Sequence, residues 1–225
     1  MKGMNRRSLL TVLALLPAAS LAFQARLAFQ AQAAPASAMV PLTDRDRADI
    51  ARIEAYLTNL RTLKARFLQV APNGTLSEGV VWLERPGKMR FQYDPPSPFL
   101  LVANYGLVVF NDRKLQQTSN IPLSQTPLGI ILAEKVKLSG DVEIIGLRRQ
   151  PGEIGLTVQR TGSPSDGSIA LMFSDPPMAL RQWVVVDQQR QETSVKLFNV
   201  ELGGSFDSKL FDVATPAPLP TAGGG

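Results

Sequence analysis

Apolar and polar residues alternate along most of the chain beyond residue 60. In the segment KMRFQY (88–93), the large apolar residues occupy every second position and polar residues lie between them. This two-residue period is typical of a β-strand with one buried face. With turn residues between such segments, the pattern predicts about eleven strands. They cover residues 62–70, 76–84, 88–94, 99–105, 107–112, 115–119, 141–149, 153–160, 168–175, 180–187 and 193–202.

Two segments have helical spacing instead. Residues 43–60 read as a helix with Thr43 as the N-cap, and residues 126–136 read as a second helix with Thr126 as the N-cap and Pro127 in the first helical position. Apolar residues form one stripe in each segment: Ile50, Ile53, Leu57 and Leu60 in the first, and Leu128, Ile131 and Leu132 in the second.

Strands with such short connections predict one antiparallel meander that coils toward a barrel. Its inner face would carry large apolar residues: Phe67, Val81, Leu83, Met89, Phe91, Tyr93, Trp183, Val185 and Leu197. A sheet of this width curls around more space than two modest helices fill. For the face as a whole we therefore expect a partly open apolar cavity. For any single residue of this set, a filled core is the alternative.

The first 33 residues have the pattern of a cleaved export signal. A basic start with Arg6 and Arg7 precedes an apolar run broken by Pro17, and small-residue cleavage sites follow at 31–33 and 36–38. The run is shorter than the ~20 residues that a membrane span needs. Cleavage could extend to residue 38, and the arginine pair is compatible with twin-arginine or general secretory export. We expect a soluble exported protein, placed in the periplasm by the family resemblance described below, with a single domain at 34–213 and a disordered tail at 214–225.

The composition of the chain argues against several classes of function. The net charge of +5 falls to +1 without residues 1–33, which hold four cations and no acid, so nucleic-acid binding loses its support. The chain has no His and no Cys, which excludes Ser-His-Asp and Cys-His catalysis and ordinary zinc sites. The acids Glu84, Asp94, Asp112, Glu143 and Asp187 are scattered at strand ends and turns. We expect neither an enzyme nor a cofactor.

One region resembles a known family. It contains Ala65-x-Phe67-x-Gln69, then Gly79-x-x-x-Leu83-x-Arg85-Pro86-Gly87-Lys88-x-Arg90, then Tyr93 and Pro95-Pro96. This region is similar to the signature of LolA, the periplasmic carrier of lipoproteins bound for the outer membrane. Residues 115–132 and 198–213 resemble later segments of the same family, so the resemblance spans roughly 44–213.

The resemblance implies a mainly β fold: an incomplete, strongly curved antiparallel β-barrel with a helical lid over an apolar cavity. Arg85 would then be a lid latch, because an inward guanidinium could donate to free backbone carbonyls of the lid. From spacing alone, an arginine that reaches solvent at the strand end is an equal alternative. The cavity lining would be Phe67, Val81, Leu83, Met89, Phe91, Tyr93 and Trp183, and the lid side chains Ile50, Ile53, Leu57, Leu128, Ile131 and Leu132. Arg90, on the opposite strand face, is expected to tolerate replacement.

The implied function is carriage of acylated lipoproteins. A monomer would accept them from the inner-membrane LolCDE transporter and deliver them to a LolB-type outer-membrane acceptor, without a cofactor or nucleic acid. Two alternatives stay open. One is a LolA-like carrier of another lipid or glycolipid. The other is a periplasmic regulator that senses lipid or lipoprotein, although related regulators typically carry an additional domain.

Overall fold

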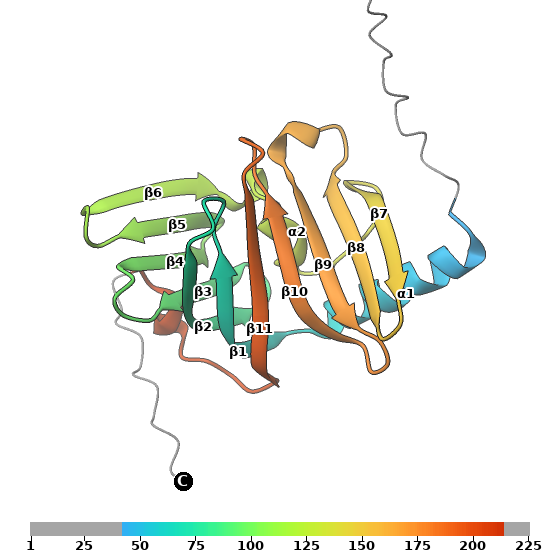
Figure 1. Ribbon diagram of the computed structural model, residues 1–225, viewed down its shortest axis with the longest axis horizontal. Helices are drawn as coiled ribbons and strands as arrows, with labels where there is room; N and C mark the ends of the chain where they lie inside the picture. Colours follow the sequence, from blue (N-terminus) through green and yellow to red (C-terminus); the bar gives the residue numbers. More distant parts are fainter. Residues whose placement is uncertain (1–41, 214–225) are drawn as a thin grey trace, which may run out of the picture. The chain divides into compact units, whose positions relative to one another are not determined.

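The computed structural model describes residues 42–213, which form one antiparallel sheet of eleven strands with short helical segments (Figure 1). The strands are β1 Thr62–Val70, β2 Leu76–Glu84, β3 Lys88–Tyr93, β4 Phe99–Asn104, β5 Leu107–Asp112, β6 Gln117–Pro122, β7 Val142–Gln150, β8 Glu153–Arg160, β9 Ser168–Ser174, β10 Ala179–Val186 and β11 Glu192–Leu202. The helical segments are α1 Asp44–Asn59, α2 Leu128–Ile131 and the 3₁₀ turns η1 Leu123–Gln125, η2 Pro164–Asp166 and η3 Ser208–Phe211. The predicted mainly β fold is confirmed.

The terminal predictions, the export signal at 1–33 and the tail at 214–225, lie outside the described residues. Within 42–213, none of the helices has the length and apolar character needed to cross a membrane.

The order of strands corrects one prediction. The sheet runs β6-β5-β4-β3-β2-β1-β11-β10-β9-β8-β7, so two meanders meet where β1 pairs with β11. The expectation of a single meander was wrong at one connection, because residues 123–141 carry the chain from β6 at one edge to β7 at the other. Among the described residues β6 and β7 do not pair, and the barrel therefore stays open.

A contact across the concave face shows how strongly the sheet curls. Phe91 on β3 and Trp183 on β10 are separated by four strand spacings, which would be about 19 Å in a flat sheet. Their ring centroids nevertheless lie 6.0 Å apart. Both side chains belong to the main hydrophobic core, which fills the concave side. The incomplete, strongly curved barrel is thus the observed architecture.

Helix α1 and residues 123–138 cover this core, and we call them the lid. Helix α1 begins as predicted: the Thr43 hydroxyl accepts from the Asp46 N–H, and the Asp46 carboxylate accepts from the Thr43 N–H. Its stripe faces the sheet, with Ile53 and Leu57 fully buried.

The second helix is shorter than predicted. Helix α2 has four residues, and Thr126 does not cap it but donates its hydroxyl to the Leu123 carbonyl. The physical reason lies in the carbonyls that follow. The Gly87 N–H donates to the Leu132 carbonyl, and Arg85 donates to the Ala133 carbonyl, so hydrogen bonds to the β2–β3 turn replace further helical ones.

The convex face of β2 and β3 is covered as well, which corrects the expectation for Arg90. Leu210 and Phe211 of η3 pack on Trp82 in a second small core. Arg90 is fully buried beneath this segment and donates to the carbonyls of Leu210 and Asp212, at 3.0 and 3.2 Å. Alternation placed Arg90 on the outer strand face correctly, but that face is not solvated here.

Candidate functional site

Arg85 lies at the junction of the sheet and both parts of the lid. It follows β2, whose Val81 and Leu83 are buried on the concave side, and it is itself only 5% exposed. Its guanidinium donates to the carbonyls of Leu57 and Leu60 at the end of α1, and to those of Ala133 and Glu134 after α2. The distances to the Ala133 oxygen are 3.0 Å from Nε and 2.7 Å from Nη2. Of the two orientations left open by spacing, the inward one is observed.

The electrostatics of Arg85 follow from this burial. Removal from water lowers the pKa of the guanidinium to about 10, and the nearby charge of Arg61 adds to the effect. The group therefore stays charged at neutral pH. The Leu57 carbonyl is one of the acceptors that the end of a helix leaves without an intrahelical partner. A buried cation and otherwise unpaired carbonyls thus satisfy each other.

The predicted cavity-lining residues lie together on the concave face. Each is buried, with exposed fractions of 4% or less: Phe67, Val81, Leu83, Met89, Phe91, Tyr93 and Trp183. The rings of Phe67 and Phe91 stand edge to face at 4.9 Å, and those of Phe67 and Tyr93 at 5.2 Å. Gly79 makes room for this cluster, because a Cβ there would be 2.7 Å from the Phe67 ring. These side chains pack on one another in a filled core, so the expected partly open apolar cavity is not observed on this face among the described residues, and the filled-core alternative is.

The predicted lid residues divide into two groups. Ile53, Leu57, Ile131 and Leu132 are buried in the same core as the concave face, whereas Ile50 and Leu128 are partly buried at its margin. Ile130, which the helical stripe left out, is 5% exposed and belongs to the core. The difference arises because α2 is a single turn, so helical spacing does not govern which of its side chains face the sheet.

Tyr93 supplies a polar group at the edge of the aromatic cluster. Its hydroxyl donates to the Gln69 side-chain oxygen at 2.8 Å. Burial raises the pKa of the Tyr93 phenol to about 12, although this hydrogen bond opposes the shift. Two residues of the sequence signature thus form one partly buried hydrogen bond between β1 and β3, which lie on either side of β2.

The N-terminal half of α1 is held by an ionic cluster that the sequence analysis missed. Arg149 on β7 contacts the carboxylates of Asp46 and Asp49 at 2.7 and 2.6 Å. Hydrogen bonds from Thr43 and Arg149 lower the pKa of Asp46 to about 2. Burial alone raises the pKa of Asp49, but hydrogen bonds from Arg149 and Arg52 leave it below its usual value. The acid-rich first turn was the available signal, but its partner strand could not be identified from spacing.

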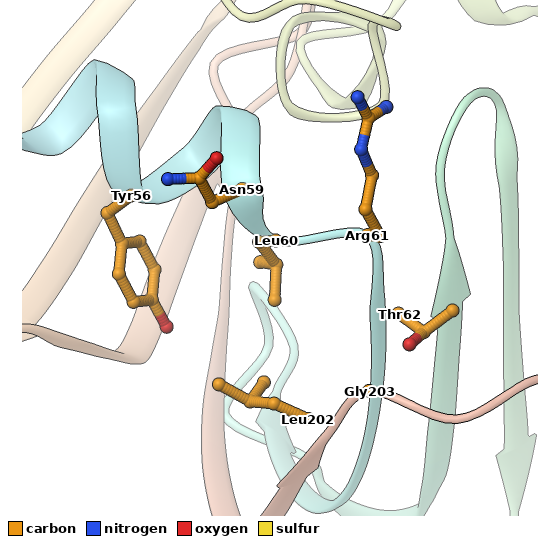
Figure 2. A pocket seen from close by; sticks show the side chains of 7 residues that line it. All are labelled: Tyr56, Asn59, Leu60, Arg61, Thr62, Leu202 and Gly203. Atoms are coloured by element: carbon orange, nitrogen blue, oxygen red, sulfur yellow. The ribbon is translucent and has the colours of Figure 1, made fainter.

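A separate cavity of about 250 Å³ lies at the C-terminal end of α1 (Figure 2). Its lining consists of Tyr56, Asn59, Leu60, Arg61, Thr62, Leu202 and Gly203, none of which belongs to the predicted cavity lining. Figure 2 shows the Arg61 side chain extending away from Leu60 and Leu202. The cavity adjoins Arg85, since the Leu60 carbonyl accepts from its guanidinium.

Fold and site together define a class: an open, strongly curved antiparallel half-barrel whose lid is tied to the sheet by a buried arginine. The family model described as "Outer membrane lipoprotein carrier protein LolA" matches residues 58–214. The chain belongs to the LolA family.

Individual relatives agree with this assignment. An outer-membrane lipoprotein carrier protein from Azotobacter vinelandii is 30% identical over 183 residues, with 76% of this chain and 86% of the relative covered. One from Dechloromonas aromatica is 26% identical over 196 residues, with 83% and 92% covered. A crystal structure of a putative outer membrane lipoprotein-sorting protein domain from Vibrio parahaemolyticus superposes with a TM-score of 0.43 at 9% identity, covering 73% of this chain and 95% of the other. Family membership rests on the sequence matches.

Proposed function

We propose that this protein is a periplasmic carrier of outer-membrane lipoproteins that shelters their acyl chains between the concave face and the lid. The observation that carries the proposal is Arg85, which donates to both lid segments from the sheet, in a chain that belongs to a lipoprotein carrier family. The aromatic cluster beneath the lid supplies the apolar surface that acyl chains require. No step of this function needs catalysis.

The energetics favour reversible uptake. Each CH₂ group removed from water contributes about 0.8 kcal/mol, so two or three acyl chains bind strongly wherever the lid admits them. Opening the closed state breaks the hydrogen bonds of Arg85 and separates packed rings such as Phe91 and Trp183. This opposing free energy lowers the net affinity for cargo, and delivery to an acceptor that has no such lid to open then proceeds downhill.

The partners follow from the same proposal. The donor is the LolCDE transporter of the inner membrane, the acceptor is a LolB-type protein of the outer membrane, and the carrier acts as a monomer after removal of its export signal. A carrier of another lipid or glycolipid would use the same concave face.

Binding of an apolar fluorescent probe tests the proposal. An acylated lipoprotein peptide should displace the probe, and the same peptide without acyl chains should not. Equal displacement by both peptides would indicate a surface that recognises peptide and would contradict the carrier function. Native mass spectrometry of the protein purified from the periplasm would then identify the bound lipid and separate lipoprotein from the other cargoes.

A further inference from the structure

The concave face holds a second arginine, Arg160, at the end of β8. Leu156 and Val158 precede it at every second position and are buried in the core, so the strand pleat directs Arg160 to the same side. Its Nε–H is buried, and its guanidinium has no hydrogen-bond or ion-pair partner among residues 42–213. The sheet therefore directs a buried donor without an acceptor toward the lid, from a side chain that is itself only partly buried.

The guanidinium lies directly against α2. A Cβ at position 129 would be 2.8 Å from Arg160 Nη2 and 2.7 Å from the Leu123 carbonyl oxygen. Because the carbonyl belongs to the backbone and cannot easily yield, Gly129 is what allows the lid to approach Arg160 so closely. Arg160 thus lies partly covered between strand and lid, and moving α2 would expose it further.

The two buried arginines, unlike the partly buried Arg160, have acceptors for donors of their guanidinium groups. Arg85 donates to lid carbonyls, and Arg90 donates to carbonyls of the C-terminal segment. A buried N–H without an acceptor, such as the Nε–H of Arg160, destabilises a protein, and in native structures it calls for an explanation. For Arg160 the explanation is an acceptor that arrives with a ligand.

We propose that Arg160 binds oxygen acceptors at the polar head of an acylated ligand, either ester carbonyl or phosphate oxygens, when the lid has moved aside. This proposal rests on the proposed function, because it requires acyl chains to lie between the sheet and the lid. The planar guanidinium offers several donors in a fixed geometry, which suits a head group with more than one oxygen. Arg160 follows the last apolar position of β8, where the head of a chain buried along Leu156 and Val158 would end.

Matched lipids test this assignment. Dioleoylglycerol and its dialkyl ether analogue have nearly the same apolar surface, but only the first has ester carbonyls. In displacement of an apolar fluorescent probe, the parent protein should bind the ester about tenfold or more tightly than the ether. Arg160→Met should lose this preference and keep its affinity for the ether. Phosphatidic acid provides the third arm: a further preference for it that Arg160→Met abolishes assigns the acceptor to phosphate.

The outcomes are distinguishable. Equal binding of all three lipids by the parent, or the same head-group preference in Arg160→Met, would overturn the Arg160 site and leave the carrier function intact. If none of the three lipids displaces the probe, both proposals fall.

Stability gives an independent readout. Methionine keeps an unbranched apolar stem and removes the buried Nε–H that has no acceptor, so the Tm of the empty Arg160→Met protein should rise by about 2–4 °C. A group with only a structural role would give the opposite sign, and a fall in Tm would overturn the proposal. The control is Arg148→Met, because Arg148 is exposed on the neighbouring strand β7 and should change neither Tm nor lipid preference.

Discussion

Replacing Arg85 by leucine removes the group that joins the two parts of the lid to the sheet. The guanidinium donates to carbonyls at the end of α1 and after α2, and each hydrogen bond to a charged donor contributes about 1.5–3 kcal/mol. The full sum is not lost, because the carbonyls regain water as the lid opens and leucine needs no hydration. We therefore expect the open state to gain about 1–3 kcal/mol relative to the closed one, or roughly 5-fold to 150-fold in the equilibrium.

Two measurements check this effect. Amide exchange in residues 44–60 and 128–138 should become faster in Arg85→Leu, whereas exchange in the core strands should not change. In a transfer assay the variant should accept acylated lipoprotein and retain it, because uptake no longer has to break the Arg85 hydrogen bonds.

Two further variants complete the comparison. Arg85→Lys keeps the charge, but a single ammonium group cannot satisfy both lid segments, so it should give an intermediate effect. Arg148→Leu, at an exposed arginine, should behave as the parent. The latch reasoning is refuted if Arg85→Leu delivers its cargo as efficiently as the parent, or if lid exchange is unaffected.

Three more predictions concern other parts of the structure. Arg90→Gln should lower the free energy of unfolding by about 1.5–3 kcal/mol in urea, since a buried guanidinium that holds the C-terminal segment is lost; an unchanged midpoint would contradict this. The pKa of Asp46 is lowered to about 2, so its stabilising contribution is complete above its usual value of 3.8 and disappears as the pH falls toward 2. The urea midpoint should therefore drop less between pH 4 and pH 2 in Arg149→Gln than in the parent. If the midpoints of the two proteins fall equally with pH, Arg149 does not contribute to the lowered pKa of Asp46. Gly129→Ala should accelerate amide exchange in α2, because its Cβ would be 2.7 Å from the Leu123 carbonyl oxygen; exchange equal to the parent would show that the lid accommodates a side chain there.

Local pattern predicted the strands well where one face is buried. The bounds of β1, β2, β5 and β8 agree with the sequence prediction to the residue, because alternation and flanking turn residues are local signals. Strand β6 was placed at 115–119 but lies at Gln117–Pro122, since its side chains are all exposed and give no apolar period. The pairing of β1 with β11 was missed, because strand order depends on contacts between distant residues.

At the candidate site, too, local patterns predicted which strand face a residue occupies but not its contacts with distant parts of the chain. Spacing placed Arg85 on the same strand face as Val81 and Leu83 but left its inward direction open, and only the family resemblance favoured it. The structure has the inward geometry, while the latch role stays a proposal. The alternation placed Arg90 on the correct, outer strand face, but the segment that buries it lies 120 residues further along the chain. Arg160 also lies on the buried face of its strand, yet only the position of α2 shows that its guanidinium lies against the lid.

The central pairing of β1 with β11 has a consequence for how the chain folds during synthesis and export. Each meander is built from hairpins between consecutive strands, whose loops are short and close quickly. The junction between the meanders joins Thr62–Val70 to Glu192–Leu202, the first strand to the last. The N-terminal meander therefore exposes the unpaired edge of β1, and much of the aromatic face, until residue 202 has emerged. A chain in this state exposes an unpaired strand edge together with apolar surface, the combination that favours aggregation, so we expect the last strand to decide when this risk ends.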